Sequence, residues 1–436
     1  MDDIKPNQKA QTNIRTEVLA GATTFLAMAY VLFVHPDMLA DTGMDRNALI
    51  AVTCIATAIA SIMTGLLTDT PIAMAPGMGL NAFFAYSIVL GEKVPWPTAL
   101  GIVFISGLLF LILTLVGVRK ALVEAIPQSL VFAISVGIGL FITFMGLANM
   151  GLVVKNEATI VAAGALTPTV LIGLGGLLLM IILEARRIKG SLIIGIVFST
   201  ILALIFGYTH FPEQAVSLNI DISPIAFKLD ILGALKGSLF GAIFSLMFID
   251  MFDSVGTVVA CGYKAGLADE QGHIRKIDRL LGIDAVATMI GALLGTSTTT
   301  AYIESGAGIE QGGRTGLTSI VTGLLFLLGL VFIPIIGIVP SYATGPALIM
   351  VGLFMMREVV RIDFSKIDEA FPAFVIVILI ALSYSISTGL AFGFIAFTLL
   401  KLVTGKTQDI KPAMLVIAVL SIIFLVFKTV EFSTGG

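Results

Sequence analysis

Carboxylates inside long apolar stretches are the first sign of chemistry in this sequence of 436 residues. Asp250 and Asp253 stand three residues apart in FIDMFDSVGT, so on a helix they share one face. Glu304 follows the run GTSTTTAYI in another apolar stretch. An ionisable group in apolar surroundings is expensive and usually functional. We therefore expect a functional role for Asp253 and Glu304 rather than one as structural acceptor or helix N-cap, whereas for Asp250 both roles stay open.

Two further acids are not expected to bind a ligand, and the first of them, Asp284, is expected to be structural. Asp284 lies in an apolar stretch of its own, near the end where Lys276 and Arg279 could pair with it. Glu310 stands close to Arg314, and we expect it at a solvated position rather than against a ligand.

Two apolar stretches cannot form unbroken helices. Thr70–Gly79 contains two prolines and two glycines, and Thr298–Gly308 begins with β-favouring residues before its own glycines. Each is expected to be an extended segment that turns into a half helix, whose N-terminus offers free N–H groups and a partial positive charge. Because irregular backbone inside a membrane must line a cavity or be buried in protein, the two breaks together predict a ligand cradle.

Other residues near these breaks have weaker signals. Asn81 can both donate and accept hydrogen bonds, as recognition of a neutral heterocycle requires, but a helix N-cap stays open as an alternative. His35 ends the first apolar stretch, Val18–Val34, and we expect a surface histidine there, with proton handling as the minor alternative. Four aromatic side chains are expected to pack in the core rather than stack on a ligand: Phe25, Tyr30, Phe83 and Phe84.

The elements that must position these residues are membrane helices. Hydrophobic residues make up 57% of the chain and charged residues only 12%, and the mean hydropathy is +1.06. The apolar stretches have the length of membrane helices, which excludes a β-barrel. The net charge of -3 and the lack of a basic block exclude nucleic acid as a partner. Cys54 and Cys261 lack metal-ligand spacing, so no metal, disulfide or cofactor is expected.

Fourteen apolar stretches predict two sets of seven spans, which divide the chain into a first repeat at 1–208, an extracytoplasmic linker at 209–236 and a second repeat at 237–436. A fifteenth piece, 414–427, either spans the membrane or lies at its surface. Three short motifs recur in the same order in both halves, among them Ile-Pro and Val-Pro, each followed at the same spacing by Gly-Leu-Phe. Because seven is odd, the repeats have inverted topology, which places a site near mid-membrane.

Lysine and arginine set the expected orientation. With the N-terminus in the cytoplasm, most of the 25 basic residues fall on the inner side, including Lys5, Lys9, Arg119 and Lys120. The N-terminus is polar and carries both signs of charge, unlike a cleavable signal peptide. Five basic residues fall on the outer side: Arg46, Lys93, Lys155, Lys228 and Lys236.

At these residues the sequence resembles the AzgA-like branch of the nucleobase-cation symporter 2 family, the bacterial and fungal purine permeases. The resemblance covers nearly the whole chain and rests on APGMGLNAFFAY, FDSVGT, GTSTTTAYIESGAG and GGRTGL. It implies an all-α polytopic membrane protein with 7+7 inverted repeats. It also implies a core domain of spans 1–4 and 8–11, a gate domain of spans 5–7 and 12–14, and proton-coupled import of a purine base across the plasma (inner) membrane. By the same resemblance, the gate could form a homodimer.

The resemblance implies roles for individual residues. Asp253 and Glu304 correspond to the acids of spans eight and ten, and Asn81 to the polar residue of span three. Where the uracil and xanthine branches have a histidine tied to proton coupling, this sequence has Thr257. Proton coupling is then expected at Asp253 or Asp250. The acid at Asp250 and the GTSTTT run resemble guanine and hypoxanthine carriers more than adenine carriers.

The chemistry of the substrate agrees with these roles. Hypoxanthine and guanine present N–H donors beside a carbonyl acceptor, so Glu304 and Asp253 can accept from the ring. Backbone N–H groups near Gly79, Leu80 and Tyr302 can donate to it. Alternating access would move the core against the gate with proton and base bound together.

Several alternatives stay open. An adenine permease of the same branch and a uracil or xanthine carrier are the nearest ones. An anion transporter or channel of the same fold is less favoured, because two carboxylates oppose an anionic ligand. An intramembrane aspartyl protease needs acids that meet from different helices, and the sequence shows no second aspartate with a matching motif. We therefore expect a transporter and not an enzyme.

Overall fold

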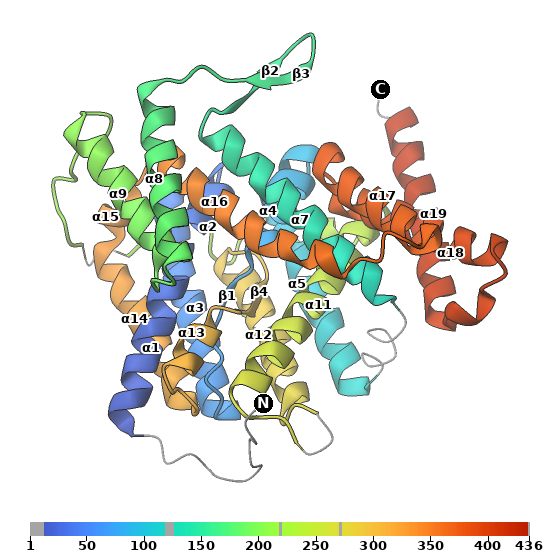
Figure 1. Ribbon diagram of the computed structural model, residues 1–436, viewed down its shortest axis with the longest axis horizontal. Helices are drawn as coiled ribbons and strands as arrows, with labels where there is room; N and C mark the ends of the chain where they lie inside the picture. The colour runs from blue at the N-terminus through green and yellow to red at the C-terminus, as the bar shows by residue number, and fades with distance from the viewer. Residues whose placement is uncertain (1–12, 118–125, 218–219, 270–272, 435–436) are drawn as a thin grey trace.

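Helices make up most of the computed structural model, which describes residues 13–117, 126–217, 220–269 and 273–434 (Figure 1). Within these residues, nine helices are long and apolar enough to cross a membrane, and three shorter apolar helices accompany them. The all-α membrane protein predicted from the sequence is confirmed. Four basic residues used for the predicted orientation lie outside the described residues: Lys5, Lys9, Arg119 and Lys120.

The first half of the chain holds nine helical elements and three short strands among the described residues. In chain order they are α1 (Ile14–Met28), α2 (Val31–Ala40), α3 (Arg46–Thr68), β1 (Met74–Pro76), α4 (Met78–Ala82), η1 (Phe83–Gly91), α5 (Trp96–Val116), α7 (Gln128–Asn149), β2 (Val153–Asn156), β3 (Ile160–Ala163), α8 (Pro168–Ala185) and α9 (Ser191–Ile205).

The second half adds one further strand and the remaining helices. In chain order they are α10 (Ile231–Ala234), η2 (Gly237–Leu239), α11 (Phe240–Lys264), α12 (Ile277–Leu294), β4 (Thr299–Ala301), α13 (Ser305–Glu310), α14 (Gly316–Gly329), η3 (Leu330–Phe332), α15 (Ile333–Gly337), α16 (Ser341–Met356), η4 (Arg357–Arg361), α17 (Ile367–Ser383), α18 (Ile386–Val403), η5 (Thr407–Asp409) and α19 (Pro412–Thr434).

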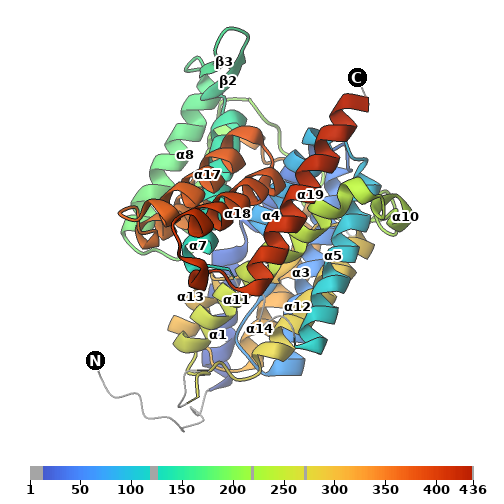
Figure 2. The same cartoon turned by 90° about the vertical axis from the view of Figure 1, so that its right-hand side faces the viewer.

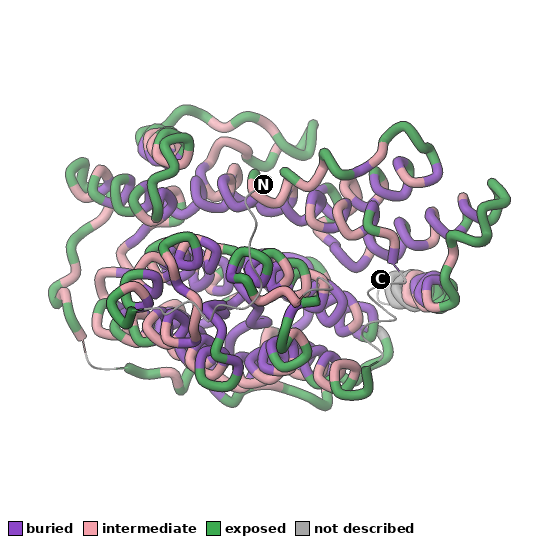
Figure 3. The backbone as a smooth tube through the Cα atoms, turned by 60° about the horizontal axis from the view of Figure 1, so that its bottom comes forward, coloured by how far each residue is buried: buried purple, intermediate pink, exposed green. Residues whose placement is uncertain are grey.

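The helices form two groups that are separate in Figure 3, where buried backbone lies inside each group and exposed backbone outside. In the first group, α14 packs on α1 and α3, and α12 packs on α5 and α11. In the second, α7 packs on α16 and α17, α17 on α18, and α8 on α9. These are the core and the gate that the sequence predicts. The division at residues 208 and 237 stays a prediction.

The repeat predicted from sequence has a direct structural counterpart in the gate. Gly139 of α7 and Gly352 of α16 each begin a Gly-Leu-Phe motif, and the two helices cross at these glycines. A Cβ atom on Gly139 would lie 2.8 Å from the Gly352 carbonyl oxygen, and one on Gly352 would lie 2.5 Å from that of Gly139. Matching residues of the two halves therefore contact each other reciprocally, as a two-fold relation between inverted repeats requires.

Strands β1 and β4 pair antiparallel in the middle of the molecule (Figure 1). The register places Met74 opposite Ala301 and Pro76 opposite Thr299, and all six strand residues are buried. Each strand leads into a short helix, α4 or α13, so the predicted extended segments and half helices are confirmed. The pairing satisfies backbone groups that would otherwise be unpaired inside the membrane.

The first span is interrupted, unlike the single stretch expected at Val18–Val34. Helices α1 and α2 are separated by Ala29 and Tyr30. The N–H groups of Leu32 and Phe33 donate to carbonyls three residues back, which tightens the chain into a turn at this point. Tyr30 lies at this turn, between the two helices.

Two elements lie at the periphery. The β2–β3 hairpin projects from one end of the molecule (Figures 1 and 2). The fifteenth apolar piece forms α19, which contacts α18 of the gate and α11 of the core.

Candidate functional site

A cavity opens where the paired strands end, between the two groups of helices. It has about 440 Å³ of empty space, including its open mouth. The broken spans, α11 and the α1–α2 turn form its core side, and α16 forms its gate side. The residues that line the cavity include Tyr30, Gly79, Asp253, Tyr302, Glu304 and Met355.

Two acids face this cavity. Asp253 of α11 is open to it, and Glu304, which directly precedes α13, is half-buried. The Tyr30 hydroxyl donates a 2.8 Å hydrogen bond to Oε1 of Glu304. The structure therefore brings together the two acids that the sequence indicated, and it adds Tyr30, which we expected only to pack.

The half helix after β1 presents its first turn to the cavity. Gly77 is its N-cap, and the first helical hydrogen bond runs from Asn81 N–H to the Gly77 carbonyl, at 2.8 Å. The N–H groups of Met78, Gly79 and Leu80 precede that bond and belong to the unpaired first turn. Gly79 lines the cavity, whereas the side chain of Leu80 is buried outside it. Their roles as donors stay predictions.

Tyr302 lines the cavity but cannot act as expected. Its N–H donates to the Ala73 carbonyl at 3.0 Å, which extends the strand pairing. Its hydroxyl donates to the Pro76 carbonyl. A backbone donor at Tyr302 is therefore not available to a ligand, because the pairing of the two breaks already uses it, and only the ring remains for contact.

Asn81 lies beside the cavity rather than in its wall. The side chain is fully buried, donates to the Pro76 carbonyl at 3.4 Å and accepts a hydrogen bond from the Ser297 hydroxyl. Because Gly77 is the N-cap of α4, the N-cap alternative for Asn81 is wrong. The observed bonds tie the break in span three to the segment before β4, and direct binding by Asn81 stays a prediction.

His35 is not a surface histidine. It lies in the middle of α2, is completely buried, and its Nε2 is 2.7 Å from the Thr296 hydroxyl. The expectation was wrong because α2 continues to Ala40, six residues past the end of the apolar stretch, and this places His35 inside the protein.

Asp284 and Asp250 lie in a second layer behind β4. Asp284 is completely buried in α12, and Lys276 donates to the Thr68 carbonyl instead of pairing with it. The expected pairing with Lys276 or Arg279 was wrong, because both bases lie at the start of the helix and Asp284 lies further in. Asp250 of α11 is also buried, outside the cavity wall, and interacts with Asp284.

Asp250 of α11 and Asp284 of α12 come from different helices and interact electrostatically, as the two acids of an aspartyl protease also would. Both carboxylates are nevertheless closed off from the cavity, so a peptide cannot reach them. The arrangement gives no support to a protease.

Glu310 lies at the exposed position expected for it. Its carboxylate pairs with Lys189 at 2.6 Å and with Lys264 at 3.2 Å. Arg314, the partner suggested by sequence, donates instead to backbone carbonyls of Ile309 and Gly313.

Comparison with known proteins places this arrangement in a family. The model of the permease family matches residues 15–392. The chain belongs to this family. It is 42% identical to the adenine permease AdeP of Escherichia coli, over 95% of this chain and 94% of that protein. It is 38% identical to the guanine/hypoxanthine permease PbuO of Bacillus subtilis, over 96% of this chain and 98% of that protein.

A solved structure supports the architecture of this permease. The transmembrane domain of a cyanobacterial bicarbonate transporter, BicA, superposes with a TM-score of 0.65 at 14% identity, over 88% of this chain and 99% of that one. At this identity the likeness concerns the fold alone. The predicted fold class and the resemblance to purine permeases are both confirmed, and the chain is a multi-pass membrane protein of a nucleobase permease family.

Proposed function

We propose that this permease imports purine nucleobases together with protons, and that hypoxanthine and guanine are its preferred substrates. The observation that carries the proposal is the pair of acids, Asp253 and Glu304, open to one cavity at the junction of core and gate. Neutral hydrogen-bond donors suit such a cavity, and anions do not. The relationship to guanine/hypoxanthine and adenine permeases supports the purine class.

Recognition follows from hydrogen-bond chemistry. A hypoxanthine or guanine ring offers N–H groups that Glu304 and Asp253 accept, and a carbonyl oxygen that the first-turn N–H groups near Gly79 and Leu80 satisfy. Tyr302 contributes ring surface, and Asn81 holds the two broken spans together beside the ligand.

Adenine is the second candidate, because the chain is more similar to the adenine permease AdeP than to the guanine/hypoxanthine permease PbuO. Adenine presents a ring nitrogen acceptor beside an amino donor. A carboxylate could bind that edge fully only when protonated, since an ionised carboxylate only accepts.

Alternating access would change the contacts between core and gate. Several polar contacts now join them, including one from the Ser87 hydroxyl of η1 to the Tyr384 carbonyl at the end of α17. Lys189, between α8 and α9, pairs with Glu310 of the core at 2.6 Å, and Thr344 of α16 donates to Asp37 of α2 at 2.7 Å. We place the Lys189 and Thr344 contacts on the cytoplasmic and outer sides respectively, with the N-terminus in the cytoplasm.

The two repeats at 1–208 and 237–436, with the linker at 209–236, each contribute helices to both groups. A gate-to-gate homodimer is part of the proposal.

Proton coupling is assigned to Asp253, with Asp250 behind it. Asp253 is the acid of α11 that a proton in the cavity can reach directly. The position that carries a histidine in the uracil and xanthine branches is Thr257, which also lines the cavity and cannot titrate.

The test is uptake of labelled hypoxanthine into proteoliposomes with and without an inward proton gradient. Unlabelled guanine, adenine, xanthine and uracil are added in turn as competitors. Gradient-dependent uptake blocked by guanine but not adenine supports the proposal. Competition by adenine assigns the second candidate, and competition by uracil or xanthine alone contradicts the purine assignment made here.

A further inference from the structure

A second acidic site lies behind the cavity, formed by Asp250 of α11 and Asp284 of α12. The two side chains are 1% and 0% exposed, and their charges act on each other. Within the described residues, neither carboxylate forms an ion pair with a lysine or arginine. Asp253 is the other acid whose charge reaches both. Two buried carboxylates whose charges repel are costly without a cation or a hydrogen between them.

Hydrogen-bond accounting at Thr288 assigns one proton to Asp250. The Thr288 hydroxyl oxygen lies 2.9 Å from the Thr299 carbonyl oxygen, 3.1 Å from the Thr299 nitrogen and 3.2 Å from Oδ2 of Asp250. A hydroxyl has one proton to donate, and a carbonyl oxygen and an ionised carboxylate can both only accept. All three contacts are satisfied if the hydroxyl donates to the carbonyl and a protonated Asp250 donates to the hydroxyl.

Asp284 is the member of the pair that lacks hydrogen-bond donors. Neither of its oxygens accepts a well-formed hydrogen bond, and the polar group that interacts with it is the Ser254 hydroxyl. Buried carboxylates normally have such partners, so the two oxygens of Asp284 are open acceptor positions in this layer.

Two hydroxyl groups connect this buried pair to the cavity. The Ser254 and Thr300 oxygens are 2.6 Å apart, and either can be the donor. Thr300 lines the cavity and interacts with Asp253, while Ser254 is fully buried and interacts with Asp284. The groups Asp253, Thr300, Ser254 and Asp284 therefore follow one another from the cavity to the buried pair, and the 2.6 Å contact between Ser254 and Thr300 lies at the centre of this series.

We propose that Asp250 and Asp284 form a second, buried proton-binding site, and that Thr300 and Ser254 relay protons between it and Asp253. In one transfer, the O–H bond of a protonated Asp253 breaks as Thr300 takes the proton. Thr300 passes its own hydroxyl proton to Ser254, and Ser254 passes its proton to the Asp284 carboxylate. Asp253 is left ionised, Asp284 becomes neutral, and both hydroxyl groups keep one proton each.

A metal cation is a poorer occupant than a proton. Among the described residues, no group of three or more histidine, cysteine, aspartate or glutamate side chains is placed to hold a metal ion. The Thr288 hydroxyl is also poorly placed to bind a cation. Its oxygen accepts the Thr299 N–H, and its proton is donated to the Thr299 carbonyl.

The first test detects the bound protons without any substrate. Infrared spectra of the purified full-length protein in lipid are recorded as the pH is raised, and the carbonyl band of protonated carboxylic acids is followed. We expect a band that persists at neutral pH in the wild type and loses intensity in Asp250→Asn and in Asp284→Asn. A band unchanged in both variants overturns the second site.

The second test separates the relay from a structural role and rests on the proposed function. Ser254→Ala removes the relay hydroxyl, Ser254→Thr keeps it, and Ser245→Ala removes a buried hydroxyl elsewhere on α11. For one proton per substrate, one pH unit supports about tenfold accumulation. We expect Ser254→Ala to lose most of this accumulation while exchange of labelled for unlabelled hypoxanthine at equal pH stays within about twofold. Ser254→Thr should restore it, and Ser245→Ala should leave it unchanged.

The outcomes distinguish the two proposals. Equal losses of accumulation and exchange in Ser254→Ala, or full accumulation by that variant, overturn the relay. Absence of purine exchange in the wild type overturns the proposed function instead, and the infrared band then still decides whether the buried pair holds protons.

Discussion

The hydroxyl of Tyr30 donates a 2.8 Å hydrogen bond to Oε1 of Glu304, across 274 positions of sequence. The bond joins the turn between α1 and α2 to the break before α13. It holds one oxygen of the Glu304 carboxylate beside the cavity.

Tyr30→Phe should weaken hypoxanthine binding, because the carboxylate loses the donor that orients it. A hydrogen bond to a charged group contributes roughly 1.5–3 kcal/mol, so the Kd should rise by about tenfold or more. The Kd is measured from the ligand-dependent shift of thermal unfolding of the purified protein.

Tyr86→Phe is the matched control. Tyr86 donates a hydrogen bond of the same length to Asp41, outside the cavity wall. Its removal should leave the Kd unchanged. Equal effects of the two substitutions would show that the Tyr30 bond has no special part in binding.

Glu304→Gln should abolish binding and uptake while the protein still folds. The amide replaces an acceptor oxygen by a donor, so it opposes the ring N–H that the carboxylate accepts. Loss of a buried charged partner costs about 2–5 kcal/mol, or at least about 30-fold in Kd. Uptake is compared at matched expression and with the monodisperse fraction measured.

Glu310→Gln makes the same chemical change in the same broken span but at an exposed ion pair. It should leave hypoxanthine binding intact. Retained uptake in Glu304→Gln would remove Glu304 from the binding site.

The two breaks were predictable from local sequence, whereas the contacts between segments distant in sequence were not. The prolines and glycines of 70–79 and the β-favouring run at 298–302 act on their own backbone, so the sequence indicated both extended segments. Their antiparallel pairing was not anticipated, because it joins residues more than 200 positions apart and depends on how the halves fold together.

The errors have the same physical origin. Tyr30, His35 and Asp284 were assigned from their neighbours in sequence, whereas the partners of the first two, Glu304 and Thr296, come from the other half of the chain. For Tyr30, the sequence did contain a signal of a polar partner, namely a tyrosine hydroxyl inside an apolar stretch. Asp284 was misassigned because bases nearby in sequence suggested a pair, although those bases lie at the helix start.

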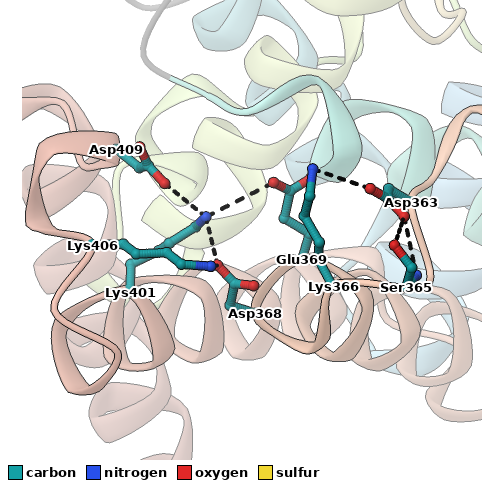
Figure 4. A network of polar contacts seen from close by, with 8 residues as sticks. All are labelled: Asp363, Ser365, Lys366, Asp368, Glu369, Lys401, Lys406 and Asp409. Carbon is teal, nitrogen blue, oxygen red and sulfur yellow. Dashed lines mark hydrogen bonds and ion pairs between the residues drawn. The ribbon is translucent and has the colours of Figure 1, made fainter.

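Lys401→Met should destabilise the gate. Lys401 is 3% exposed and joins the ends of α17 and α18 through Asp368 at 2.7 Å and Asp409 at 2.9 Å (Figure 4). Removing it leaves Asp368, also buried, with Lys406 as its remaining cation. Breaking such a network should cost at least about 2 kcal/mol, seen as a lower midpoint of thermal unfolding.

Lys366→Met is the control in the same network. Its ammonium pairs with Asp363 at 3.1 Å at a solvent-exposed position, where an ion pair contributes little (Figure 4). The midpoint should barely change. A similar loss in both variants would mean that burial of Lys401 does not strengthen its pairs.

Gly139→Ala should destabilise the protein, because α7 and α16 cross in direct backbone contact at this residue. The added Cβ would lie 2.8 Å from both the Gly352 carbonyl oxygen and the Met355 Cβ, so the helices must separate. Overpacking of this kind costs about 1–3 kcal/mol. Gly282→Ala, in α12, adds the same methyl group where nothing lies within 4 Å and should stabilise the helix by up to about 1 kcal/mol. Opposite shifts of the unfolding midpoint are expected, and a gain in stability from Gly139→Ala would contradict the close crossing of the two repeats.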